Sequence, residues 1–245
     1  MHIDCLKPLA PRRARPAAGT PNQYKMQNRQ LTIPDRLSER RAAWGADPRV
    51  APMGELAEQL GRSLPEGIRP ALFGSLACDA AWPAYSDVDL ALFLSEIPTS
   101  EAVARVVQVW RRSIPLILRI DPVQHHGPYV FFETDAALFW PSRLPVATLA
   151  RATMLDGRPL TLEIRPLEDR LLSMDGLLGA YAGLRRMGGR GRVLADRYSA
   201  KALGSIALLA PALLAGALGR PMEKGEAFAW FKAQVDAPVR AAIER

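Results

Sequence analysis

Apolar residues recur at helical and strand spacings along the first half of the chain. Spacings of three and four positions predict a helix over 51–64, with its apolar stripe at Met53, Leu56, Leu60 and Leu64. The short apolar run 68–73 predicts a strand that closes at Gly74-Ser75. Strict alternation over 86–94 predicts a second strand, with Val88, Leu90, Leu92 and Leu94 on one face and Asp87, Asp89, Ala91 and Phe93 on the other.

The pattern continues downstream with a helix and two further strands. An amphipathic stripe predicts a helix over 101–112, and apolar runs predict strands over 115–120 and 129–134. A helical pattern also begins near Pro34, and proline suits the first position of a helix. The order strand, turn, strand, helix, strand predicts an α+β fold, with a small mixed sheet that carries helices on one side.

Proline and glycine divide the chain into four parts. Residues 1–34 are rich in proline and basic residues with almost no apolar periodicity, which predicts a disordered basic arm. Residues 35–140 form the α+β domain, and 141–166, with four prolines, are interpreted as a linker. From 167 to 245 the pattern is helical, strongest over 198–209 and 224–235, with a Gly/Arg-rich connection over 185–192.

Charge and composition indicate which partners and which cellular compartment to expect. The chain has 245 residues and a net charge of +7, but residues 1–41 carry nine basic and three acidic side chains and so hold +6 of it. A basic arm can touch nucleic acid, although a solvated tail explains the same composition and is preferred. There is no apolar stretch of the roughly 20 residues that cross a membrane. Two cysteines and the lack of an apolar leader favour a cytoplasmic protein.

Asp87 and Asp89 are the strongest candidates for chemistry. Two positions apart on a strand, they point to the same face, with Cβ atoms about 6.5–7 Å apart. Carboxylates at that separation can hold divalent ions such as Mg²⁺, which prefers oxygen ligands. The opposite strand face is uniformly apolar, so the strand is central and its two acids need a compensating partner such as a metal.

Upstream of these acids, the predicted strand over 68–73 ends at Gly74-Ser75. Glycine permits a tight turn and close approach of a ligand to the backbone, and a serine hydroxyl adds a hydrogen-bond donor. If a helix starts after the turn, its free N–H groups also suit phosphate.

These residues together resemble the signature of the DNA polymerase β-type nucleotidyltransferase superfamily. Leu72-Phe73-Gly74-Ser75 is followed, after eleven residues, by Asp87-Val88-Asp89-Leu90. The nearest resemblance is to bacterial aminoglycoside nucleotidyltransferase-like and minimal nucleotidyltransferase-domain proteins. It implies a catalytic domain over 35–140, a nucleoside triphosphate such as ATP bound at Gly74 and Ser75, and two Mg²⁺ ions held by the aspartates.

The resemblance also implies a third acid that completes the metal site and acts as the base. Asp121 is preferred because it ends the apolar run that is interpreted as a neighbouring strand, and Glu133 and Asp135 are its rivals. His125 and His126 are candidate cleft residues, because the chain has only one other histidine.

The helical half is expected to supply the other wall of the site. Tyr198 and Lys201 share one helix face, and in aminoglycoside nucleotidyltransferase-like proteins a comparable helix brings a lysine to the triphosphate. Lys201 is therefore a candidate for binding phosphate and Tyr198 for packing on the base or ribose. A lysine whose stem simply lies along apolar surface is the alternative.

Two functions follow from these residues. The first is an enzyme that transfers a nucleoside monophosphate, as AMP from ATP, to a hydroxyl on a small molecule, a protein or an RNA. The second is a non-catalytic interaction protein with the same fold, such as the antitoxin of a toxin–antitoxin pair. The acceptor is not encoded in any recognisable pattern.

Overall fold

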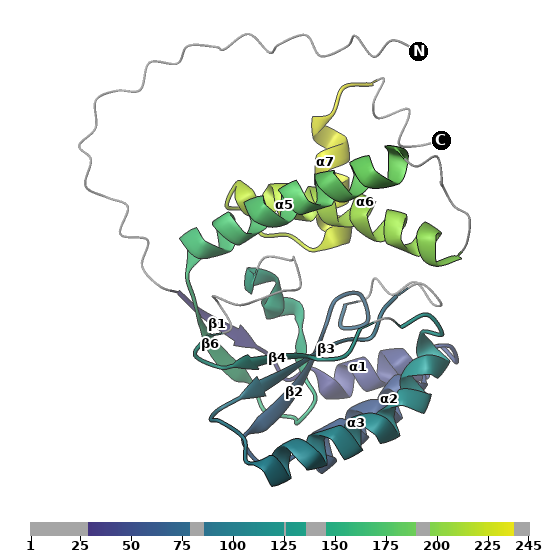
Figure 1. Cartoon of the computed structure of the whole chain (residues 1–245), viewed down its shortest axis with the longest axis vertical. Coiled ribbons are helices and arrows are strands. Elements are labelled where there is room, and N and C mark those ends of the chain that lie inside the picture. The colour runs from purple at the N-terminus through teal and green to yellow at the C-terminus, as the bar shows by residue number, and fades with distance from the viewer. Residues whose placement is uncertain (1–28, 79–85, 125, 136–145, 190–196, 238–245) are drawn as a thin grey trace, which may run out of the picture.

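A four-stranded mixed sheet forms the centre of the molecule in the computed structural model, which describes residues 29–78, 86–124, 126–135, 146–189 and 197–237 (Figure 1). Its strand order is β4 (Tyr129–Phe132), β3 (Asp89–Leu94), β2 (Ile68–Phe73), β5 (Thr153–Met154). The pairs β2–β3 and β2–β5 are antiparallel and β3–β4 is parallel. The central position predicted for the strand of Asp89 is confirmed.

Three helices cover one face of this sheet: α1 (Leu37–Gly45), α2 (Pro52–Ser63) and α3 (Ser100–Ile120). Val88 and Leu90 pack with Met53 and Leu56 of α2 and with α3 in one core. The predicted alternation is therefore confirmed, because the Val/Leu face of β3 lies against helices. The α2 helix starts at Pro52, whereas α1 starts three residues after Pro34, which is not a helical position.

The opposite face of the sheet is covered by a second, two-stranded sheet. Here β1 (Arg29–Ile33) pairs antiparallel with β6 (Leu160–Ile164), and the 3-10 helix η1 (Val146–Arg151) lies against the same core. Phe73 and Phe93 pack into this core with Ile33 and Leu162.

The second sheet corrects two predictions. The arm predicted over 1–34 includes β1, while residues 1–28 lie outside the described part. The segment interpreted as a linker contains η1, β5 and β6. In both places alternating residues are buried, Leu31 and Ile33 facing the same core as Leu160, Leu162 and Ile164. Neighbouring prolines conceal strands this short, because each supplies only a few alternating positions.

A third correction concerns residues 115–120, which form the last turns of α3 and not a strand. Leu116, Ile117 and Ile120 are buried against α2 and the sheet, at helical spacing from Val109. Pro115 lies inside this helix. An apolar run has no period of its own, and here burial continues the upstream helix through a residue that normally interrupts one.

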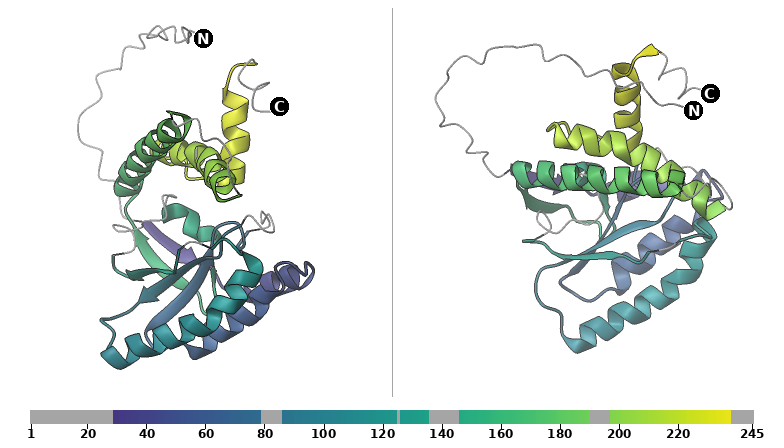
Figure 2. Two further views of the ribbon diagram at one scale, coloured as in Figure 1. Left: turned by 45° about the vertical axis from the view of Figure 1, so that its right-hand side comes forward. Right: turned by 45° about the horizontal axis from the view of Figure 1, so that its top comes forward.

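The C-terminal helices form a separate small core above the sheet (Figure 2). They are α5 (Pro166–Gly189), α6 (Arg197–Ala217, which passes through Pro211) and α7 (Lys224–Gln234), and they pack through Ala180, Leu209, Ala212, Leu213 and Ala227. Asp169 of α5 accepts a hydrogen bond from the Val146 backbone, and Arg151 pairs with Glu226 at 2.7 Å. The α+β class and the helical C-terminal part are confirmed. Among the described residues, none of the helices has the length and apolarity to cross a membrane.

Candidate functional site

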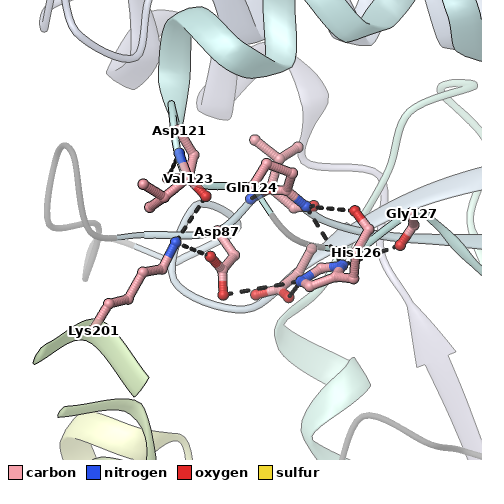
Figure 3. Close-up of polar contacts among 9 residues, drawn as sticks. Asp87, Asp121, Val123, Gln124, His126, Gly127 and Lys201 are labelled. Carbon is pink, nitrogen blue, oxygen red and sulfur yellow. Dashed lines mark hydrogen bonds and ion pairs between the residues drawn. The ribbon is translucent and has the colours of Figure 1, made fainter. Parts of the chain in front are cut away.

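Asp89 is the first residue of β3 and Asp87 lies two residues before it, on the other side of the buried Val88. Both carboxylates are half-buried and approach the imidazole of His126, with Nε2 at 3.9 Å from Asp87 Oδ2 and 3.5 Å from Asp89 Oδ1. Figure 3 shows Asp87 between His126 and Lys201. The two carboxylates therefore share one neighbour, the imidazole of His126.

Gly74 lies directly against Asp89. Phe73 is the register partner of Asp89 across β2 and β3, so the turn that follows Phe73 meets that carboxylate. Gly74 has φ +73°, and a Cβ at this position would overlap Asp89 Oδ2 and Cγ. Glycine is therefore required twice, for the backbone conformation and for the space.

Ser75 follows in a turn that runs to Cys78, where the described segment ends. The turn is closed by the Ala77 N–H, which donates to the Gly74 carbonyl at 3.2 Å, and Ser75 itself is half-buried. Ser75 thus directly follows the glycine that meets the carboxylate of Asp89.

Gln124 fixes the backbone between the two aspartates, a role that the sequence pattern does not reveal. Its Oε1 accepts the Val88 N–H at 3.0 Å, and its Nε2 donates to the Val88 carbonyl at 3.3 Å. The same Nε2 donates to the His126 carbonyl at 2.9 Å. One side-chain amide therefore ties the β3 start to the loop that carries His126.

His126 faces the carboxylates through Nε2, while its Nδ1 lies 3.0 Å from the carbonyl of Gly127. The hydrogen bond to Asp89 raises the pKa of His126, burial opposes it, and the Gly127 carbonyl adds to the rise. Asp87, Asp89 and His126 each offer a ligand atom, and these atoms lie within 4.8 Å of one another. His126 thus lies beside Asp87 and Asp89, while His125 lies outside the described residues.

Asp121 reaches the site from a different element than predicted. It caps the C-terminus of α3, and its side chain is fully buried. Oδ1 accepts the Val123 N–H at 3.1 Å and Oδ2 accepts a hydrogen bond from Lys201 at 2.8 Å. The expectation of a strand-end acid is wrong, because the preceding run is helical, yet the helix ends beside Asp87.

The rival acids Glu133 and Asp135 lie elsewhere. Strand β4 runs parallel to β3 and pairs Phe132 with Leu94, so the residues after it emerge at the far end of β3 from Asp89. The Glu133 N–H bonds the Leu94 carbonyl there.

Lys201 enters from α6 and joins the helical part to the site. Its side chain is buried, and Nζ contacts Asp87 Oδ1 and Asp121 Oδ2 (Figure 3). Burial lowers the pKa of Lys201, but hydrogen bonds to Asp121 and Asp87 outweigh this and raise it. Lys201 was expected on the triphosphate; it lies instead between two carboxylates. Tyr198 is in the first turn of α6, and its side chain lies outside the described part.

The assembled site contains three carboxylates, one imidazole and one ammonium group. It can hold a divalent cation at the aspartates and imidazole, and its ammonium balances the buried Asp121. Comparison of the chain with protein-family models, with curated proteins and with solved structures found no match.

Proposed function

We propose that this chain is a metal-dependent nucleotidyltransferase that moves a nucleoside monophosphate, as AMP from ATP, to a hydroxyl acceptor. The observation that carries the proposal is the contact between Gly74 and the carboxylate of Asp89. The Gly-Ser turn and the aspartate pair are separate halves of one sequence motif, and they adjoin in space. The acceptor class, whether a small molecule, a protein or an RNA, is open.

The residues divide the work as follows. Asp87, Asp89 and His126 would hold a divalent ion, which when bound neutralises the triphosphate and lowers the pKa of the acceptor hydroxyl. The turn at Gly74-Ser75 offers backbone and hydroxyl donors to phosphate oxygens. Lys201 brings a positive charge to the same place.

In the transfer, the acceptor oxygen forms a bond to the α-phosphorus and the α–β phosphoanhydride bond breaks, with both electrons leaving on pyrophosphate. The hydroxyl proton passes to a carboxylate of the site. Asp121 was expected to take it, but both of its oxygens already accept hydrogen bonds.

The test is pyrophosphate release from each labelled triphosphate with Mg²⁺ or Mn²⁺, using fractionated cell extract as the source of acceptor. Wild type should release pyrophosphate and label an acceptor, and Asp87→Ala should abolish both. Asp135→Ala is the matched control, because Asp135 lies beyond β4, toward the far end of β3, and should leave both unchanged. Equal results for wild type and Asp87→Ala would refute the proposal.

One observation favours the non-catalytic alternative, an antitoxin-like interaction protein. Lys201 neutralises Asp121, the acid expected to act as base. This alternative predicts that triphosphate binds without release of pyrophosphate for any acceptor fraction, and that Asp87→Ala leaves association with the partner protein intact.

A further inference from the structure

We propose that the site binds one divalent transition-metal ion, such as Mn²⁺, through Asp87, Asp89 and His126, and that the ammonium of Lys201 occupies the place of a second ion. The inference deepens the proposed function and rests on it only for the identity of the substrate. It departs from the expectation of two Mg²⁺ ions on three carboxylates.

The orientation of His126 supports its role as a ligand. A metal-binding histidine commonly donates its other ring N–H to a carbonyl or carboxylate, which fixes the tautomer and aims the free lone pair at the metal. Here Nδ1 is 3.0 Å from the Gly127 carbonyl, which can only accept a hydrogen bond, so Nδ1 is the donor and Nε2 is the ring nitrogen that faces the carboxylates and is available to a metal. Nε2 and one oxygen from each of Asp87 and Asp89 lie within 4.8 Å of one another.

The surroundings hold these ligands in place before a metal arrives. Gln124 bonds both the backbone between the aspartates and the His126 carbonyl. Gly74 admits the Asp89 carboxylate where any side chain would exclude it. The ligands are thus fixed by groups that contact no metal themselves.

The ammonium group of Lys201 supplies the positive charge that a second metal ion would otherwise provide. Its side chain is 4% exposed and that of Asp121 is not exposed, and Nζ contacts both Asp121 and Asp87. The three carboxylates carry a charge of −3, which one divalent ion and one ammonium group balance. A second divalent ion would have to share Asp87 and Asp121 with a buried positive charge, which Coulomb repulsion disfavours.

The imidazole also determines which metal is preferred. Mg²⁺ takes oxygen ligands in near-ideal octahedral geometry, whereas imidazole suits first-row transition metals. Replacing the third carboxylate by His126 should therefore shift selectivity from Mg²⁺ toward Mn²⁺.

The experiment uses the full chain and Mn²⁺ in the absence of nucleotide. Equilibrium titration followed by electron paramagnetic resonance should give one bound Mn²⁺ per chain, with electron spin-echo modulation from a directly bound imidazole nitrogen. His126→Gln should remove that modulation and should weaken Mn²⁺ binding by at least tenfold, more than it weakens Mg²⁺ binding. His125→Gln should retain the modulation and the Mn²⁺ affinity. Lys201→Ala should raise the stoichiometry toward two.

Several results would overturn the inference. Binding of two Mn²⁺ ions to the wild-type chain would show that Lys201 does not take the place of a second ion. Nitrogen modulation that survives in His126→Gln, or that disappears in His125→Gln, would show that His126 is not the bound imidazole. The stoichiometry and the modulation of the wild-type chain test the inference even where a variant fails to fold. Because nucleotide is absent, failure here is separate from failure to release pyrophosphate, which tests the proposed function.

Discussion

The side-chain amide of Gln124 is bonded to both backbone polar groups of Val88, accepting from its N–H at 3.0 Å and donating to its carbonyl at 3.3 Å. Val88 precedes β3 and is 1% exposed, so these groups are satisfied in the protein interior by a side chain. Since Asp87 and Asp89 adjoin Val88, the amide sets the position of both carboxylates.

Replacing this amide should damage stability and the site together. Gln124→Leu keeps the approximate volume but leaves buried backbone groups of Val88 unpaired, which costs about 1–3 kcal/mol. Mn²⁺ affinity should fall about tenfold or more, as for other groups that orient metal ligands. Urea denaturation of metal-free protein and Mn²⁺ titration measure the two effects.

The matched control for Gln124 is Gln59, whose amide bridges α2 to the Val109 carbonyl and Ser113 of α3. Gln59→Leu should lower the free energy of unfolding without changing Mn²⁺ affinity. Equal Mn²⁺ affinity of the two variants would show that Gln124 has no influence on the site.

The central half of the fold could be predicted from the sequence because its elements are long or strictly alternating. The strand at 68–73 follows from its short apolar run closed by Gly74-Ser75, the Val/Leu face of β3 from alternation, and the helix over 51–64 from its stripe. The last turns of α3 could not be predicted, because apolar residues around Pro115 have no period that separates strand from helix. Strands β1 and β6 depend on pairing between segments far apart in the chain.

The site was predicted in part for a similar reason. Asp87, Asp89 and Gly74 belong to one local pattern, and the contact between Gly74 and Asp89 follows from antiparallel pairing of adjacent strands. The pairing of Lys201 with Asp121 joins residues from two distant helices, so spacing carries no signal for it. The amide of Gln124 bonds backbone groups. Because every residue has such groups, no sequence pattern identifies this contact.

Gly74→Ala should be more harmful than a glycine substitution with the same backbone conformation. Gly74 and Gly157 have φ of +73° and +72°, and alanine in that region costs roughly 1–2 kcal/mol. A Cβ at Gly157 meets nothing within 4 Å, whereas at Gly74 it overlaps the Asp89 carboxylate. Gly157→Ala should therefore show strain alone, and Gly74→Ala an additional loss of stability and of metal and triphosphate affinity. Equal unfolding free energies and equal affinities would contradict the contact.

Part of the stability at neutral pH should come from Asp156 and be lost below about pH 4. Burial raises the pKa of this carboxyl, but its hydrogen bond with Arg69, supported by Arg158, outweighs burial and lowers the pKa. A lowered folded pKa means that Asp156 stabilises the protein above its unfolded pKa of about 3.9 and that this contribution is lost as the pH falls through the folded value.

Urea denaturation between pH 7 and pH 3 checks this sign. Asp156→Asn should be less stable than wild type at pH 7, and the difference should shrink as the pH falls below about 4. Asp47→Asn is the control: Arg49 lowers the pKa of Asp47 through hydrogen bonds, but this pair is solvent-exposed and should contribute little. A constant difference between wild type and Asp156→Asn would contradict the assignment.

The ion pair of Lys201 and Asp121 should behave as a buried pair whose members depend on each other. Lys201→Met leaves the fully buried Asp121 without its cation and should cost about 3–5 kcal/mol in metal-free buffer, while Arg151→Gln, which breaks the exposed pair with Glu226, should cost at most about 1 kcal/mol. The double variant Lys201→Met/Asp121→Asn removes both charges and should regain most of the loss. A double-mutant cycle on unfolding free energies measures the coupling. If Lys201→Met is as stable as Arg151→Gln, or if the double variant is no more stable than Lys201→Met, the two side chains are not paired in the protein, and α6 is positioned over the site by its apolar contacts alone.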